Sequence, residues 1–432
     1  MSNTNSLEYA YEPVPKDKRM KLPALILVLA GYPIALSNFV IGGLIGINST
    51  YIDAITAILI GNSMLIAIVI LMGILACKYG IASSFLARRA FGQKGSLIFS
   101  MLIFLSCLTW MAVNGDIFGN LMVNLFSWWP LPASVTAVIV VFLWLISAMK
   151  GAKGLAIMAS FGVPAALICA VVGFISVGNT DGGYGSVFNF IPDNQMTFTA
   201  ATASIVGGWV VGATITSDFS RFAQKPTHVV IGGITSFIVG GMGFQLVGTT
   251  VAISTGESDF IAAMIALGLG ILAFFVAVFC LWTTQDKDIY AGSLAIQNMI
   301  KDTKLSGRLT HKHTSLIFVV LTAVLAASGV FNFLLPIIQF LSVLIPPVVG
   351  VVLIEGFFIK SSKENIVVNR TAIIAWIVGG LVSYLSLTFN FFISPLIGII
   401  TASIVYLVLE KVKSAKQVKA GQEELDTVKK AV

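Results

Sequence analysis

Residues 27–46 read LVLAGYPIALSNFVIGGLIG, and residues 205–213 read IVGGWVVGA. Both segments are apolar, and both contain residues that interrupt a helix. Pro33 removes a backbone donor, and the glycines of both segments lower the cost of unwinding. Unwound backbone at membrane depth is tolerated only where it is buried in protein or lines a cavity. The two segments therefore predict two broken membrane helices; close helix packing at small residues is the alternative for either segment alone.

The composition of the chain indicates a lipid environment. Of its 432 residues, 57% are hydrophobic and only 10% are charged, and the mean hydropathy is +0.95. Soluble domains carry roughly 25% charged residues, so this chain has too few polar side chains to cover a surface that faces water. The cysteines lie inside apolar runs without a ligand-type spacing, which argues against a disulfide framework or a zinc site. They are Cys77, Cys107, Cys169 and Cys280.

The apolar runs predict an all-α membrane protein with twelve transmembrane helices, since each span needs about 20 mostly apolar residues. Their centres lie near residues 35, 65, 110, 140, 165, 208, 240, 275, 322, 345, 380 and 400. We expect a cytoplasmic leader over residues 1–22, a transporter domain over 23–410 and a charged cytoplasmic tail over 411–432. The loops offer little room for catalytic water chemistry, so we expect no enzyme and a site inside the bundle.

The positive charges indicate how these spans are oriented. Twelve spans with both termini in the cytoplasm put every Lys and Arg except Lys287 on the inner side, and the outer loops then hold only acidic charges. This distribution follows the rule that short cytoplasmic loops are rich in Lys and Arg. The net charge of +7 is therefore an orientation signal and not a nucleic-acid footprint.

The two interrupted segments lie in the first and the sixth spans, which run in opposite directions because they are five spans apart. This arrangement predicts two five-helix repeats of inverted topology, over about residues 23–178 and 197–358, and two additional helices over about 371–410. In such folds the site forms where both helices break, and the half-helix ends offer amides and carbonyls to a polar substrate and a cation.

Four short stretches, together with the stretch of the first two spans that ends in Ala57–Asn62, carry a resemblance to a known family. The four are LARRAFG (Leu86–Gly92), TITSDFSRF (Thr214–Phe222), LWTTQDKDIY (Leu281–Tyr290) and IPPVVG (Ile345–Gly350). With them, nearly the whole chain resembles the nucleobase–cation symporters of the purine/cytosine permease type, especially bacterial cytosine permeases. The resemblance implies a leucine-transporter-like fold in a bacterial plasma membrane. It also implies alternating access and co-transport of a nucleobase or related heterocycle with sodium or a proton.

The resemblance also implies a substrate site. Trp110 in the third span and Trp209 in the sixth match the aromatic residues that sandwich the base in the family, and a planar heterocycle needs such faces. The backbone around Gly208 would contact the substrate edge. Gln285 matches a family position that is usually Asn, and its amide would either read the base or join two helices.

Some positions depart from the cytosine-permease pattern. Cys107 stands where cytosine permeases carry a base-reading Gln, and Val211 and Gly208 replace substrate-facing serines. These differences argue against cytosine itself. They leave other purines, pyrimidines or a thiamine-precursor pyrimidine open.

The resemblance places a sodium site beside the broken first span. Its ligands would be the hydroxyls of Thr283 and Thr284 and the carbonyls of Ala35, Asn38 and Cys280. As an alternative, the two hydroxyls bond back to the preceding helical turn, which is their common behaviour in membrane helices.

Charged residues within spans are functional candidates by default. Asp116 would bind substrate, carry a proton or pair with another helix. Asp286, Lys287 and Asp288 lie together towards the inner half of the eighth span. Lys287 has three interpretations: it snorkels to the cytoplasm, it pairs with the flanking acids, or it replaces sodium in a proton-driven transporter.

Two further features suggest gating or structural roles. Asp218 and Arg221 are three residues apart at the inner end of the sixth span, a spacing that predicts an ion pair. Pro346 and Pro347 predict a bend in the tenth span, as a gate or as a plain kink.

The sequence thus predicts a secondary transporter for a heterocycle, with sodium or a proton as the coupling ion, lipid as its surroundings, and neither cofactor nor nucleic acid as a partner. The first rival hypothesis is a transporter of the same fold for amino acids or other amines. A channel and a solute-sensing receptor are further rivals.

Overall fold

The computed structural model describes residues 9, 12–328, 334–360, 363 and 365–431. Part of the predicted leader, residues 1–8 and 10–11, lies outside the described residues. Every regular element of the described residues is a helix, and their β-type pairing is limited to one isolated bridge between Met20 and Ala223. The predicted all-α class is therefore confirmed.

The first span is broken, as its sequence predicts. Helix α1 (Leu22–Ala30) ends at Gly31, and helix α2 (Leu36–Gly46) begins after Ala35 in extended backbone. The sixth span is different, because α9 (Phe198–Ser220) runs without interruption through Gly207–Gly212. The predicted break in the sixth span is thus wrong, and its glycines serve close packing instead.

The remaining spans follow the predicted order. Among the described residues, eight helical stretches are long and apolar enough to cross a membrane. The other four predicted spans are the broken α1–α2, the shorter α6 and α14, and the charged α13. The bounds are α3 Tyr51–Tyr79, α5 Ser96–Leu125, α6 Ala133–Ala148, α7 Gly151–Val177, α10 Pro226–Ser236 with the π-helix η2 Phe237–Gly243 and α11 Phe244–Thr255, α13 Gly270–Ile300, α14 His311–Ala326, α15 Leu334–Ile354 with the π-helix η4 Glu355–Ile359, α16 Arg370–Phe389 and α17 Ser394–Ala431.

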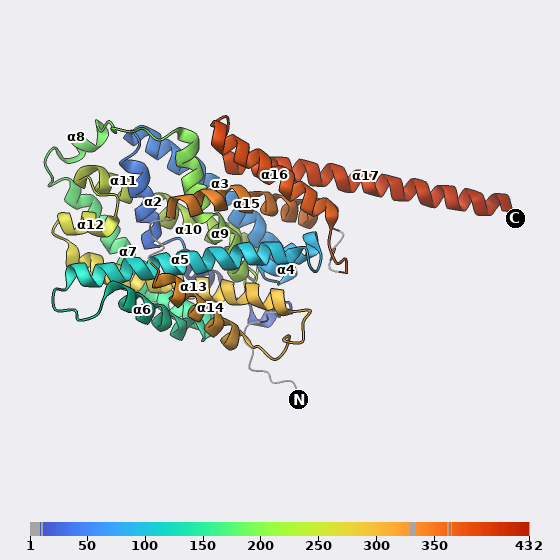
Figure 1. Cartoon of the computed structure of the whole chain (residues 1–432), viewed down its shortest axis with the longest axis horizontal. Coiled ribbons are helices and arrows are strands. Elements are labelled where there is room, and N and C mark those ends of the chain that lie inside the picture. The colour runs from blue at the N-terminus through green and yellow to red at the C-terminus, as the bar shows by residue number, and fades with distance from the viewer. Residues whose placement is uncertain (1–8, 10–11, 329–333, 361–362, 364, 432) are drawn as a thin grey trace.

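Among the described residues, four short helices lie outside the spans, the first before span one and the other three in connections between spans. They are η1 Lys16–Lys18, α4 Ser83–Phe91, α8 Gly183–Phe188 and α12 Phe260–Ala266. In Figure 1, α4 lies at the end of the bundle from which α17 projects, and α8 and α12 lie at the opposite end.

Helix packing reproduces the inverted repeat. Span one packs on span seven through α1–α10 and α2–α11, and span six packs on span two through α9–α3. Likewise α1 packs on α7, and α9 packs on α15. The contacts of the first span with the second repeat and with the fifth span thus have counterparts around the sixth span. Helices α16 and α17 pack on each other and on α15, so the two last spans flank the tenth.

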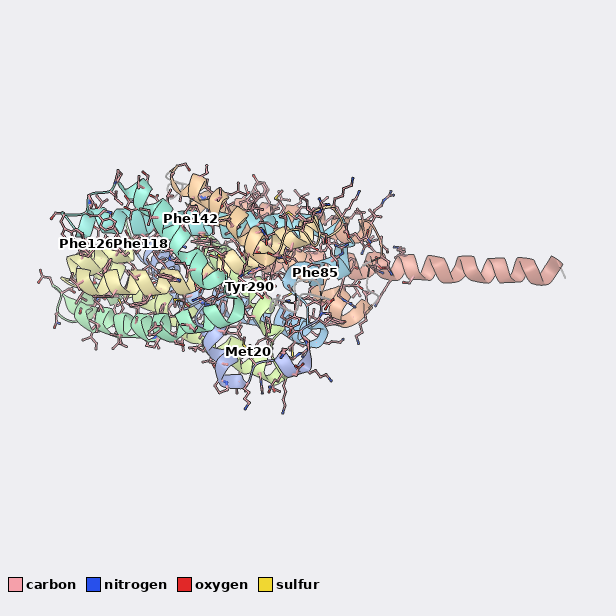
Figure 2. All side chains as sticks on the ribbon, turned by 90° about the horizontal axis from the view of Figure 1, so that it is seen from below. Met20, Phe85, Phe118, Phe126, Phe142 and Tyr290 are labelled. Atoms are coloured by element: carbon pink, nitrogen blue, oxygen red, sulfur yellow. The ribbon has the colours of Figure 1, made fainter. Side chains whose placement is uncertain are left out.

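Segments rich in positive charge meet at one end of the bundle. Met20 N–H donates to the Phe222 carbonyl at 2.6 Å, and the Arg19 guanidinium donates to the Cys77 carbonyl at 2.9 Å. The Lys301 ammonium lies over the Phe85 ring. Figure 2 shows Met20 and Phe85 towards this end, with Phe118 and Phe126 at the other. These contacts agree with the predicted clustering of Lys and Arg on one side.

The hydrogen bonds at this end also account for the polar residues of the TSDFSRF stretch. The Asp218 carboxylate accepts the Ser83 N–H at 2.6 Å, so it caps the first turn of α4. Arg221 Nε donates to the Asp218 carbonyl at 3.0 Å, and its guanidinium also donates to the Tyr290 hydroxyl at 2.8 Å. Through these bonds Asp218 joins α9 to α4 and Arg221 joins α9 to α13, and the ion pair between the two side chains stays a prediction.

The outer faces of the bundle expose large apolar side chains. Phe161 and Ile175 on α7, Val324 on α14 and Leu381 on α16 are each more than half exposed. Apolar surface on this scale marks a lipid-facing region. The integral, multi-pass placement predicted from composition follows from these faces and the apolar helices.

Candidate functional site

A buried chain of amide side chains closes the break in the first span. Asn38 Nδ2 donates to the Pro33 carbonyl at 2.5 Å. Gln245 Nε2 on α11 donates to Asn38 Oδ1 at 2.7 Å, and Asn62 Nδ2 on α3 donates to Gln245 Oε1 at 2.7 Å. The three amide residues have no exposed surface. Backbone left unpaired by unwinding is thus satisfied inside the protein, as membrane burial requires.

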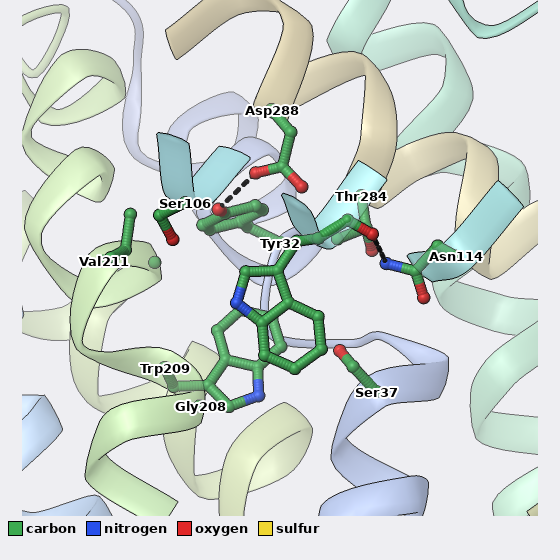
Figure 3. A pocket seen from close by; sticks show the side chains of 11 residues that line it. Tyr32, Ser37, Ser106, Asn114, Gly208, Trp209, Val211, Thr284 and Asp288 are labelled. Atoms are coloured by element: carbon green, nitrogen blue, oxygen red, sulfur yellow. Dashed lines mark hydrogen bonds between the residues drawn. The ribbon is translucent and has the colours of Figure 1, made fainter. Parts of the chain in front are cut away.

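A narrow pocket lies between this break and α5, α9 and α13 (Figure 3). Its cavity volume is only about 20 Å³ in this conformation. Its walls combine aromatic faces with hydroxyl, amide and carboxylate groups. The lining residues are Tyr32, Ser37, Ser106, Trp110, Asn114, Gly208, Trp209, Val211, Gly212, Thr284 and Asp288.

The Trp209 indole is held by other rings and by a glycine. Its ring lies edge-on to Tyr32 with centroids 5.4 Å apart, and edge-on to Phe237 at 6.2 Å. A Cβ on Gly212 would lie 2.6 Å from Trp209 Cε3, so only glycine leaves room for the indole in this position. The structure brings Trp110, Trp209 and Gly208 into one pocket, and their role in binding stays a prediction.

A carboxylate faces the same pocket. Asp288 is 3% exposed, and its Oδ1 accepts the Tyr32 hydroxyl at 2.7 Å. Thr284 precedes it by one helical turn on α13, so both side chains share a face. Cys107 on α5 lies beside this carboxylate, although it is not among the lining residues.

Three polar atoms of the lining residues have no partner within the described protein. They are Ser106 Oγ, Asn114 Oδ1 and Trp209 Nε1. The orientation of the Asn114 amide is fixed because its Nδ2 donates to the Trp110 carbonyl at 2.9 Å. Buried polar groups are nearly always hydrogen-bonded. Three unpaired atoms around one pocket therefore indicate that the pocket takes a polar ligand.

Lys287 lies on a different face of α13, next to the broken span. Its side chain has no exposed surface, which overturns the snorkelling interpretation. The ammonium lies 3.0 Å from Thr283 Oγ1 and 3.6 Å from Asp286 Oδ1, and it also donates to the Thr283 carbonyl. Thr283 in turn donates to the Gly31 carbonyl at 3.2 Å. The Lys287 amine therefore lies where α13 meets the end of α1.

The predicted sodium ligands bond to other protein groups in this structure. The Ala35 carbonyl accepts the Asn38 N–H at 3.1 Å, and the Cys280 carbonyl accepts the Thr284 hydroxyl at 2.9 Å. The alternative prediction, in which a hydroxyl bonds to the preceding turn, describes Thr284. Thr283 instead reaches across to α1.

Other predicted residues lie away from the pocket. Gln285 is fully buried with both amide atoms unpaired in the described protein, yet it is not a lining residue. Asp116 accepts from Asn120 Nδ2 at 3.1 Å on a partly exposed face of α5. Pro346 and Pro347 lie inside α15, which stays helical through both.

The sequence reasoning missed Ser106 and Asn114 as lining residues, although their spacing from the predicted Trp110 would have found them. Ser106, Trp110 and Asn114 are four residues apart, so they share one face of α5. Asp288 follows Thr284 by the same interval on α13. Tyr32 and Ser37 belong to the interrupted stretch itself. Lys287 and Asp288 are adjacent in sequence, so only the helices packed against α13 determine which of the two side chains faces the pocket.

The broken first span, the paired repeats and the central pocket define a membrane transporter of the leucine-transporter-like class. Residues 13–409 match the family described as "Permease for cytosine/purines, uracil, thiamine, allantoin". The chain belongs to this family. The cytosine permease of Escherichia coli strain K12 is 27% identical over 380 residues, which cover 87% of each chain.

Solved structures show the same fold. Mhp1, a nucleobase-cation-symport-1 family transporter, in a closed conformation with bromovinylhydantoin bound, matches with a TM-score of 0.81 at 17% identity, over 94% of this chain and 95% of that one. Mhp1 in an inward-facing conformation matches with a TM-score of 0.75 at 18% identity, over 94% of this chain and 93% of that one. A Na+-coupled sialic acid symporter matches with a TM-score of 0.69 at 13% identity, over 95% of this chain and 93% of that one. The predicted leucine-transporter-like fold is confirmed.

Proposed function

We propose that this chain is a secondary active transporter that imports a nucleobase or related planar heterocycle by alternating access. The observation that carries the proposal is the pocket at the break of the first span. It joins two indoles, which suit the faces of a heterocycle, to unpaired polar atoms that suit its edges. Trp110, Trp209, Gly208 and Asp288 are the proposed contacts. Family membership and the cytosine permease relative support this substrate class.

Sodium is the first candidate for the coupling ion. The family resemblance supports it, with Thr283, Thr284 and the carbonyls of Ala35, Asn38 and Cys280 as ligands. The Thr283 hydroxyl lies at the break, since it donates to the Gly31 carbonyl, and the Thr284 hydroxyl donates to the carbonyl of Cys280, another proposed ligand.

A proton gradient is the second candidate, and the position of Lys287 favours it. A sodium ion on Thr283 Oγ1 would lie a few ångströms from the ammonium, which is 3.0 Å from the same oxygen. Two such charges at about 4 Å repel by roughly 4 kcal/mol at an effective dielectric of 20. The resident ammonium would therefore supply the positive charge that sodium supplies in a sodium-coupled relative.

Uptake by the full chain in proteoliposomes tests the function and separates the two candidates. Labelled purines and pyrimidines, with amino acids as the rival substrates, are offered with a sodium gradient, with potassium in its place, and with a protonophore. Accumulation of a heterocycle supports the proposal, and accumulation of amino acids alone contradicts it. Loss of uptake in potassium supports sodium; loss with the protonophore at unchanged sodium supports the proton.

We place both termini on the cytoplasmic side of a bacterial plasma membrane, because the positive segments share one end of the bundle. The four native cysteines are buried, so a single exposed cysteine can be labelled selectively. An impermeant maleimide added to intact cells should label Asp181→Cys and spare Lys304→Cys. The reverse pattern would invert the topology.

A further inference from the structure

The Asp288 carboxylate is the most unusual group in the pocket. It is almost fully buried, and among the described residues it makes no ion pair. Lys287 is its neighbour in sequence but bonds to Thr283 and Asp286 on another face of α13. A carboxylate buried without a cation needs several hydrogen-bond donors.

The protein supplies few of those donors. The Tyr32 hydroxyl donates to Oδ1, and the neighbouring Cys107 thiol is a weak donor at best. A carboxylate offers about four acceptor positions. Acceptor capacity therefore remains on Asp288, at the edge of a pocket that Figure 3 shows it facing.

The rest of the pocket is also richer in acceptors than in donors. Asn114 Oδ1 is a second unpaired acceptor, and the Thr284 hydroxyl has already given its hydrogen to the Cys280 carbonyl. Trp209 Nε1 is the one unpaired lining atom that can only donate, and Ser106 Oγ can do either. A ligand that matches this set must bring more N–H groups than carbonyls to the side of Asp288.

Heterocycles differ in whether they can do this. Guanine and isocytosine carry an amino group next to a ring N–H, which gives two parallel donors for one carboxylate. Hypoxanthine and 4(3H)-pyrimidinone lack the amino group, and uracil flanks N3–H with two carbonyls. Neutral cytosine places its amino group beside an acceptor nitrogen.

We propose that Asp288 is a specificity-determining residue that selects heterocycles with an amino group beside a ring N–H, as in guanine and isocytosine. Tyr32 positions the carboxylate, and Trp209 supports the ring face. The inference rests on the proposed heterocycle transport and adds which hydrogen-bonding edge of the heterocycle the protein recognises.

Two matched ligand pairs test this inference on the purified full chain in lipid nanodiscs. Isothermal titration compares isocytosine with 4(3H)-pyrimidinone, and guanine with hypoxanthine; each pair differs only in the amino group. We expect the amino member of each pair to bind about tenfold tighter or more, since a hydrogen bond to a charged group contributes on that scale. Equal affinities within both pairs would overturn the inference and leave the proposed transport intact.

Variants separate recognition from a structural role. Asp288→Asn should reduce the preference within each pair to less than about threefold, because it should weaken isocytosine more than 4(3H)-pyrimidinone, which keeps only the ring N–H as a donor. Tyr32→Phe keeps the carboxylate but removes the hydrogen bond that positions it, so it should lower the preference less than Asp288→Asn does. Equal weakening of both pair members in Asp288→Asn would assign Asp288 a structural role and overturn the inference. If no purine or pyrimidine binds the unaltered chain, the proposed function fails as well.

Discussion

The first and sixth spans occupy corresponding places in the two repeats, yet only one of them is broken. Both carry clustered glycines. The chain between α1 and α2 leaves the helix over residues 31–35, whereas α9 continues through Gly207–Gly212. The difference shows that glycines permit unwinding but do not cause it.

Proline and a buried polar network account for the break. Pro33 lacks the N–H that an unbroken helix would use. Asn38 then donates to the Pro33 carbonyl that the break exposes, and Gln245 donates to the Asn38 side-chain oxygen and so holds this amide in place. In α9 each glycine costs about 1 kcal/mol relative to alanine, and nearly complete burial of the helix offsets that cost.

The two spans consequently contribute different chemistry to one pocket. The broken span provides Tyr32 and Ser37 from irregular backbone. The continuous span provides a rigid aromatic platform at Trp209, for which Gly212 leaves the space. Variants in each span can break or sharpen this comparison.

Asn38→Ala should have the largest effect. It leaves the Pro33 carbonyl and the Gln245 amide buried without their partner, and each unpaired group costs about 1–3 kcal/mol. We expect the free energy of unfolding to fall by roughly 2–5 kcal/mol, which thermal melting in nanodiscs measures. We also expect uptake to be lost in the transport assay. Asn48→Ala, which removes one half-buried bond to the Leu44 carbonyl, is the matched control. Equal effects of the two variants would show that the network does not maintain the break.

Trp209→Ala should abolish most substrate affinity and leave the fold intact. Loss of an aromatic face and of an unpaired N–H donor predicts at least about a 30-fold weaker affinity, or roughly 2 kcal/mol. Titration of the preferred heterocycle measures it. Trp128→Ala is the control, because Trp128 is 70% exposed. Unchanged affinity in Trp209→Ala would remove the platform role of α9.

Gly212→Ala should act through Trp209 rather than through the helix. The new Cβ would lie 2.6 Å from the indole and 3.1 Å from the Tyr32 ring, so the indole must shift. We expect about tenfold weaker binding with a small change in melting temperature. Gly185→Ala, where nothing lies within 4 Å of the added atom, should change neither. Tight binding in Gly212→Ala would mean that the indole is free to move.

Gly208→Ala should have the smallest effect on stability. Its Cβ would meet only the flexible end of Ile41, at 2.5 Å, and alanine favours a continuous helix by about 1 kcal/mol. The free energy of unfolding should change by no more than about 1 kcal/mol. A loss of several kcal/mol would indicate a non-helical backbone at Gly208 and restore the symmetric pair of breaks.

Sequence reasoning reached the fold class and much of the pocket. Scarce charge and apolar length predicted the spans, and Pro33 with its neighbouring glycines located the real break. The prediction of a break in α9 is wrong. Gly207, Gly208 and Gly212 form the same sequence pattern whether they unwind a helix or allow Ile41 and Trp209 to pack closely against it.

Side-chain direction was the other limit. Asp286, Lys287 and Asp288 are consecutive, and their separation onto different faces depends on how α13 is turned against α1, α5 and α6. The resemblance directed attention to Gln285, whereas the helix turns Asp288 towards the pocket. The rotation of α13 about its axis cannot be predicted from the sequence of that helix alone.

A structure of the full chain in nanodiscs with its preferred heterocycle bound tests the central claim most directly. The account predicts the ring against the Trp209 indole, with its edge within hydrogen-bond distance of Asp288 and Asn114, and α9 continuous beside the broken first span. A ring bound away from these residues, or an α9 unwound at Gly208, would contradict it.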